Sequence, residues 1–314
     1  MGRTALQALK FATATAAVYL LLFLALVKVR IGDRPLLLRT NDYYQTKGGV
    51  SAMKFREWSA DSTHDAIVIG SSHAYRGYDP RVFSERGHHM FNLGTSAQTP
   101  LSSFAVLEAY VTEGRTPLVI FDMYENAFDH PGVESVSDLT LNMGNDVAAL
   151  HLALAFRDLR GLNMFTYRMM DRGSTTAWVL TDYVGRGAAI SPDSTRAGVK
   201  YPRPRPFRMD GRQLEKFLDC LDLCAERGIH VVLSTHYYPL QGERARHRRF
   251  RHEVDSVLAR RPAPPPLWID LAETPGIDDH DHFCDHNHLN AAGARRFTGQ
   301  LIDTLEARGL LPRP

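Results

Sequence analysis

The sequence is poor in cysteine and has no excess of charge of one sign. Three cysteines occur among 314 residues, too few and too unevenly spaced for a disulfide framework. Lysine and arginine together number 37 against 35 acidic residues, and the arginines alternate with acids, so no basic stripe marks a nucleic-acid footprint. Internal repeats and long low-complexity tracts are also missing. We therefore exclude a disulfide scaffold and expect no nucleic-acid partner.

Long apolar runs are equally scarce, with one exception near the N-terminus. Residues 11–27 contain no charge and are flanked by Lys10 and Lys28. A cleaved signal peptide has a similar basic start and apolar middle, but its apolar core is usually about 7 to 15 residues long. Here the run is longer, and Val-Lys-Val-Arg follows it where small cleavage-site residues are expected. We therefore favour an uncleaved membrane anchor over residues 1–28, whose orientation the flanking charges do not determine.

The rest of the chain has the length of one α/β domain with an appendage. Residues 29–64 are mixed and polar, which predicts a stalk or a segment that wraps the domain. The main domain is expected over residues 65–314. Between about 129 and 210 the pattern becomes helical and irregular, so we predict an insertion that overhangs the active face and shapes acceptor specificity.

Short apolar runs alternate with helical patterns along the main domain. Buried parallel strands are predicted at 66–69, 90–93, 117–122, 229–234 and 267–271. Helices are predicted at 101–113, 211–227, 242–260 and 290–308. This order predicts a three-layer α/β fold, an open parallel sheet of flavodoxin-like type with helices on both faces, preceded by one transmembrane helix.

Two serines stand in the turn that follows the first of these strands, in Gly70-Ser71-Ser72-His73. Such a turn presents a hydroxyl at the carboxyl edge of the sheet, where open α/β folds bind their ligands. Serine becomes a nucleophile when an imidazole takes its proton, and an acid behind the imidazole selects its tautomer. Asp285 and His288 stand three residues apart before the last helix, so one short segment supplies both. The pattern predicts a Ser-His-Asp site.

These two blocks resemble those of the SGNH or GDSL-like hydrolases and acyltransferases. The resemblance rests on residues 67–75 and on Asp285-x-x-His288, and it covers residues 65–128 and 212–305. In that family the serine follows glycine after one intervening residue, which makes Ser72 the nucleophile and Ser71 the alternative. The resemblance implies an acyl-Ser72 intermediate, with His288 as base and then acid and with Asp285 orienting it.

The family's oxyanion hole is matched less closely. Its second block corresponds to residues 92–99, where Ala97 stands at the usual glycine position and Gly94 lies three positions earlier. The resemblance implies a backbone N–H from one of these two residues and another from Ser72. The third block corresponds to residues 121–126, lacks its glycine and leaves Asn126 as a candidate donor.

The eroded third block and the apolar N-terminus are similar to the membrane-anchored branch that works beside membrane-bound O-acyltransferases. That resemblance implies a cofactor-free O-acetyl or O-acyl transferase acting on a cell-envelope polysaccharide or exopolysaccharide, in the periplasm or outside the cell. A carbohydrate esterase or deacetylase of the same fold uses the same three residues, so this alternative stays open. An inactive polysaccharide-binding or scaffold protein of an export complex is the alternative without catalysis.

Several other polar residues have two interpretations. Residues 278–288 are dense in aspartate and histidine, but no second cluster at matching spacing accompanies them, so we expect no metal site. His73 is expected to start a helix or to contact substrate. His236 follows the strand at 229–234 and is expected to contact substrate or to be satisfied by a local hydrogen bond. The arginine-rich stretch 244–251 is expected to be a solvated face or to meet an anionic polymer or lipid head groups.

Overall fold

The protein is described by a computed structural model that covers residues 2–32, 34–58, 64–112, 114–171, 182–195, 199–201, 205–240 and 244–311. A parallel sheet of five strands lies at its centre, in the order β4-β3-β5-β8-β9. The strands are β3 (Ala66–Ile69), β4 (Met90–Asn92), β5 (Leu118–Asp122), β8 (His230–Thr235) and β9 (Leu267–Asp270). All five predicted strands are therefore present, in a flavodoxin-like order.

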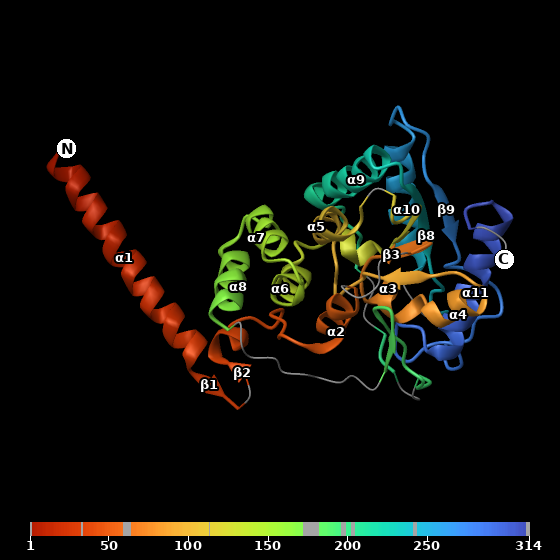
Figure 1. Cartoon of the computed structure of the whole chain (residues 1–314), viewed down its shortest axis with the longest axis horizontal. Helices are drawn as coiled ribbons and strands as arrows, with labels where there is room; N and C mark the ends of the chain where they lie inside the picture. The colour runs from red at the N-terminus through yellow and green to blue at the C-terminus, as the bar shows by residue number, and fades with distance from the viewer. Residues whose placement is uncertain are drawn as a thin grey trace.

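Both faces of the sheet are buried, which explains why its strands are continuously apolar. Along β3, Ile67 and Ile69 belong to one core and Ala66 and Val68 to the other, because successive side chains point to opposite faces. The first face is covered by α5 (Pro100–Tyr110), α9 (Gly211–Glu226) and α10 (Arg244–Leu258). The second is covered by α3 (Ser72–Gly77), α4 (Pro80–Glu85) and α11 (Ala291–Ala307) (Figure 1). The predicted three-layer α/β fold is confirmed.

The helix boundaries have local causes. Helix α9 is capped by Asp210, whose side chain accepts hydrogen bonds from the N–H groups of Arg212 and Gln213. Its Cys220 and Cys224 face the core one turn apart, so these cysteines are packing residues. Helix α5 ends at Tyr110, three residues earlier than predicted, because Val111 turns to an extended conformation while its N–H closes the last turn.

The segment between the N-terminal helix and the sheet folds onto the domain. It forms the short strands β1 (Arg30–Ile31) and β2 (Arg34–Pro35), the 3-10 helix η1 (Leu36–Arg39) and α2 (Gly49–Trp58). Leu37, Leu38 and Phe55 are buried in the same core as Ile67. This part of the chain therefore contributes to the packing of the domain.

The predicted insertion contains two different parts. Helices α6 (Val133–Asn142), α7 (Asp146–Ala155) and α8 (Leu159–Met170) pack on one another and on α2 and α5, beside the sheet (Figure 1). They follow η2 (Glu125–Phe128). The hairpin of β6 (Tyr183–Gly185) and β7 (Ala188–Ala189) instead reaches the edge strand, where the Asn92 N–H donates to the Arg186 carbonyl at 2.9 Å. The first part also reaches the loop after β4, where the Ser96 hydroxyl donates to Glu134 of α6.

Helix α1 (Arg3–Lys28) projects from the rest of the molecule (Figure 1). Its 26 residues span about 39 Å at the α-helical rise, enough to cross the ~30 Å hydrocarbon core of a bilayer. The mean hydropathy of its most apolar stretch is 2.0, and Phe23 and Val27 are its buried residues. Among the residues that the structure describes, α1 is therefore the one helix long and apolar enough to span a membrane.

Candidate active site

The turn after β3 depends on a glycine. Gly70 has a φ of 151°, and a Cβ added there would lie 2.6 Å from the Cβ of Asp122 on β5. The chain passes through this turn directly into α3, whose first residue is Ser72. Ser71 is the N-cap of α3, and its side chain accepts a hydrogen bond from the His73 N–H at 3.3 Å. The Ser71 hydroxyl is therefore used for capping, and Ser72 is the serine that faces the last loop.

Ser72, His288 and Asp285 form one connected chain of hydrogen bonds. The Ser72 Oγ lies 2.8 Å from His288 Nε2, although 216 residues separate them. The His288 Nδ1 lies 2.8 Å from Asp285 Oδ2. This is the order of contacts in which an imidazole can take the serine proton while a carboxylate stabilises its charge.

Asp285 is held by more than its contact with the imidazole. Its Oδ1 accepts the backbone N–H of Asn287 at 3.0 Å and that of His288 at 2.8 Å. Burial acts to raise the pKa of Asp285, but the His288 ring and the two N–H donors outweigh it and hold the pKa well below its usual range. Asp285 is therefore ionised at neutral pH.

The loop that carries these residues is braced by the insertion. The Thr195 hydroxyl donates to the carbonyl of Phe283 at 2.8 Å and lies 3.3 Å from that of Asp285. Ser191 pairs with Asn290, which caps α11 by accepting the Gly293 N–H. A segment from outside the sheet thus supports the loop from behind.

The two candidate backbone donors near residues 92–99 differ in their availability. The Gly94 N–H already donates to Asn92 Oδ1 at 3.0 Å, and a Cβ at Gly94 would lie 2.6 Å from that of Ala74, so this glycine serves close packing. Ala97 has a φ of 45°, which is rare for a residue with a side chain. Its N–H donates to no group within the described chain. The loop is tied to the nucleophile turn by the Thr95 N–H, which donates to the Gly70 carbonyl at 3.1 Å.

Ala97 and Ser72 are thus the two candidate donors whose N–H groups are available. The Ser72 N–H lies at the start of α3, where no intrahelical acceptor exists.

Asn126 has its amide group engaged elsewhere. Its Nδ2 donates to the Tyr124 hydroxyl, and its Oδ1 accepts from Arg246 and, at 3.4 Å, from Arg205. In this arrangement Asn126 links Tyr124 to two arginines, which leaves one of its two N–H groups without an acceptor among the described residues. The third block of the family pattern therefore supplies a contact between the site and a basic surface.

His73 and His236 lie behind the site in a stack of aromatic rings. They are 3% and 1% exposed, so the structure offers neither to a substrate directly. The His73 ring centroid lies 3.7 Å from that of Tyr124, 4.2 Å from that of His236 and 5.4 Å from that of His288. Burial lowers the pKa of His236 to about 4, and burial together with neighbouring histidines lowers the pKa of His73 well below its usual value. Both rings are neutral at neutral pH.

Two residues close to the site were not anticipated from the sequence. Asp122 lies against Gly70 and accepts a hydrogen bond from Tyr78 at 3.1 Å, and burial raises its pKa to about 8. Its position at the carboxyl end of a strand was the available signal. Lys54 on α2 is fully buried, and its Nζ donates to the Gly94 carbonyl. Burial lowers the pKa of Lys54 to about 7, and no local pattern distinguishes it from a solvated lysine.

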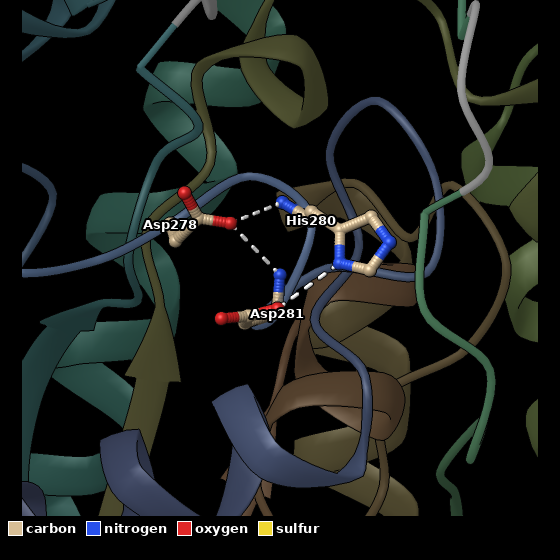
Figure 2. Close-up of side chains that lie close together, drawn as sticks. All are labelled: Asp278, His280 and Asp281. Carbon is tan, nitrogen blue, oxygen red and sulfur yellow. Dashed lines mark hydrogen bonds and ion pairs between the residues drawn. The ribbon is translucent and has the colours of Figure 1, made fainter.

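The aspartate- and histidine-rich stretch divides between two places. Asp285 and His288 turn toward Ser72, whereas Asp278, His280 and Asp281 form an exposed turn (Figure 2). The Asp278 Oδ1 accepts the N–H of His280 at 2.8 Å and that of Asp281 at 3.0 Å. These hydrogen bonds within the turn explain why the three possible ligand groups lie close together.

Comparison with known proteins gives low-similarity structural matches. No family model matches the chain, and no curated protein matches it. A GDSL-like lipase from Bacteroides thetaiotaomicron is 10% identical, with a TM-score of 0.42, over 83% of this chain and 100% of that one. A protein described as an acylhydrolase from Bacteroides fragilis is 11% identical, with a TM-score of 0.42, over 82% and 95%.

A third match is a protein described as lipolytic and of the G-D-S-L family, from Desulfitobacterium hafniense. It is 11% identical, with a TM-score of 0.40, over 78% of this chain and 99% of that one. These TM-scores are low, so the chemistry of the site rests on its own geometry.

Proposed function

We propose that the protein is a serine acyl-transfer enzyme of the SGNH type, acting through an acyl-Ser72 intermediate. The observation that carries the proposal is the chain of two 2.8 Å contacts from Ser72 Oγ through His288 to Asp285. The motif blocks at both ends of the domain and the parallel sheet between them support it. An inactive polysaccharide-binding or scaffold protein would need no such chain of contacts.

In the first half of the reaction, His288 Nε2 takes the Ser72 proton as the Oγ attacks the acyl carbonyl carbon. The carbonyl oxygen becomes negatively charged, and the backbone N–H groups of Ser72 and Ala97 stabilise it by donating hydrogen bonds. When the carbonyl reforms, the bond to the leaving oxygen breaks, and His288 donates its proton to that oxygen. Asp285 stabilises the imidazolium throughout.

In the second half, an acceptor hydroxyl gives its proton to His288 and attacks the acyl-Ser72 carbonyl. The bond from the acyl carbon to Ser72 Oγ then breaks, and His288 returns the proton to Oγ. A sugar hydroxyl as acceptor makes the enzyme an O-acyltransferase, and water makes it an esterase. We favour transfer of an acetyl or other acyl group to a cell-envelope polysaccharide or exopolysaccharide. The support is the membrane-length α1 and the third block without its glycine, both similar to the branch that works with a membrane-bound O-acyltransferase. In this proposal α1 is an uncleaved anchor, and the domain faces the periplasm or the exterior.

A fluorophosphonate probe tests the nucleophile. It should label the wild type and the Ser71→Ala variant but not Ser72→Ala, because only Ser72 is paired with the imidazole. If Ser72→Ala is still labelled and Ser71→Ala is not, Ser71 is the nucleophile. A folded wild type that stays unlabelled would favour the inactive binding or scaffold protein.

Release of acetate from a small aryl ester tests the acceptor. The transferase predicts that an oligosaccharide acceptor speeds turnover and becomes acetylated, since deacylation by water is slow. Hydrolysis that no acceptor alters would favour the carbohydrate esterase. Sequencing the N-terminus of the mature protein from membranes separately tests whether α1 is retained.

A further inference from the structure

A groove of about 640 Å³ lies beside the start of α10, and five of its ten lining residues are arginines. The arginines are Arg205, Arg244, Arg246, Arg248 and Arg249, and Glu273 is the acidic residue among the lining side chains. We call these five arginines and the space between them the arginine groove. A concave surface with this composition has the chemistry of an anion site.

At the inner end of the arginine groove, two arginines contact the carboxylate of Asp129. Arg246 is 5% exposed and pairs with Asp129, which is also 5% exposed. Arg205 reaches the same carboxylate at 3.5 Å, and its side chain is 63% exposed. Both arginines also contact the Asn126 Oδ1. Arg246 is therefore buried and fixed, whereas the exposed Arg205 presents its guanidinium group to the groove.

At the outer end of the arginine groove, Arg248 and Arg249 pair with carboxylates, whereas Arg244 contacts a backbone carbonyl. Arg248 pairs with Glu273, and Arg249 pairs with Glu253 at 2.9 Å. Arg244 donates to the Tyr238 carbonyl at 3.3 Å, and its Nε is buried without a partner. Within the described residues, Arg244 makes no ion pair with a carboxylate. Among the described residues, the arginine groove therefore offers the buried Nε–H of Arg244 as a hydrogen-bond donor without a partner.

The arginine groove is joined to the candidate active site by a short series of contacts. Asn126 holds the two inner arginines through its Oδ1 and donates to the Tyr124 hydroxyl through its Nδ2. The same hydroxyl accepts from Asn287 at 3.2 Å, one residue before His288. The Tyr124 ring also stacks on His73, which follows Ser72. A ligand in the groove therefore lies one layer of side chains from the triad.

We propose that the arginine groove binds the carboxylate or phosphate groups of an anionic acceptor polymer whose neighbouring unit is acylated at Ser72. This rests on the proposed function and adds the charge of the substrate. Planar guanidinium groups bind both kinds of anion with paired hydrogen bonds. Regularly spaced charges on a polymer match arginines spread along a groove.

A lipid surface is the other source of such anions. We commit to the polymer because the contacts from Asn126 through Tyr124 join the arginine groove to the candidate active site, where the polymer would be acylated.

The test uses the full chain in phosphatidylcholine nanodiscs, with Ser72→Ala to prevent turnover. Binding of polygalacturonate, polyphosphate and neutral dextran is measured by fluorescence anisotropy. The double variant Arg244→Gln with Arg248→Gln should weaken binding of an anionic polymer by about tenfold or more, because charged paired hydrogen bonds are lost. The matched control, Arg86→Gln with Arg295→Gln, removes the same charge from exposed ion pairs of α4 and α11 and should change it by less than about twofold.

Several outcomes overturn the proposal. Equal losses in both double variants would mean bulk charge alone, and binding no stronger than to dextran would mean that the groove holds no anion. Groove-dependent binding to added vesicles containing phosphatidylglycerol, without polymer binding, would assign the groove to lipid. Unfolding midpoints of both variants exclude misfolding. Probe labelling of the wild type is measured separately, so the proposed enzyme can fail while binding of the polymer stands.

Discussion

Replacement of Asp285 by asparagine separates the orientation of His288 from its presence. The carboxylate makes three contacts: Oδ2 with the imidazole Nδ1 at 2.8 Å, and Oδ1 with the N–H groups of Asn287 and His288 at 3.0 and 2.8 Å. An asparagine can keep its oxygen on the two backbone donors. Its NH₂ group then faces Nδ1 and can only donate.

The imidazole must then carry its proton on Nε2, the atom that lies 2.8 Å from the Ser72 hydroxyl. In that tautomer Nε2 cannot accept the serine proton. The expected loss in kcat is about four orders of magnitude, as loss of the correct tautomer costs in other serine triads, equal to ~5 kcal/mol of barrier. Since the backbone contacts persist and the side chain is 41% exposed, the free energy of unfolding should fall by only about 1 kcal/mol.

The assay is hydrolysis of an aryl acetate under saturating substrate, alongside denaturant unfolding of the same protein. Asp281→Asn is the control, because this carboxylate is exposed on the same loop and contacts only the neighbouring His280. A rate loss below about tenfold for Asp285→Asn would refute the role of the carboxylate in selecting the tautomer. A large loss in stability would instead mean that the loop had collapsed.

Three further changes test the surroundings of the site. Ala97→Gly should keep activity and raise the free energy of unfolding by about 0.5 to 1 kcal/mol, since the positive φ no longer strains a side chain. Lys54→Met removes a lysine whose pKa of about 7 in the folded protein lies below its unfolded value, so the unfolded wild type binds more protons between about pH 7 and 10.5. Over this range the free energy of unfolding of the wild type should rise by on the order of 5 kcal/mol relative to the variant. His247 is the opposite case: burial lowers its pKa, but Asp270 and Glu125 outweigh this and raise it to about 9. Its contribution, on the order of 3 kcal/mol, is present below about pH 6.5 and lost as the pH rises through 9, and His247→Phe should remove that decline.

Each of these is measured as the difference between wild-type and variant unfolding curves, since the two pH effects overlap in the wild type. A glycine at position 97 that destabilises by more than about 1 kcal/mol would contradict the strain at Ala97. Parallel pH curves for wild type and Lys54→Met would mean that the lysine is not charged differently on folding. The same result for His247→Phe would remove its pairing with Asp270.

The elements of the fold were predictable because their causes are local. Continuous apolar runs such as 66–69 belong to strands buried on both faces, and the amphipathic spacing of Phe217, Cys220 and Cys224 marks the buried side of α9. Asp285 and His288 were recognisable as a pair because three residues of one turn bring them together. Such patterns depend on neighbours in the chain, so the sequence carries them in full.

What the sequence left open depends on partners that are distant along the chain. Ser72 contacts His288 across 216 residues because β3 and β9 end at the same edge of a parallel sheet, where the turn after β3 and the loop after β9 begin. The choice between Gly94 and Ala97 as oxyanion donor depends on the hydrogen bond that the Gly94 N–H makes to Asn92 and on the positive φ of Ala97. Asn126 is engaged by Arg246 from α10, which no local pattern announces.

The sequence by itself therefore determined the strands, the nucleophile turn and the acid-base pair, whose geometry follows from local chain spacing. Tertiary structure decided which serine meets the imidazole, which N–H groups remain available, and that an arginine groove lies beside the site. Whether a polar group finds a hydrogen-bond partner depends on the folded chain, because the partners come from segments that the sheet brings together.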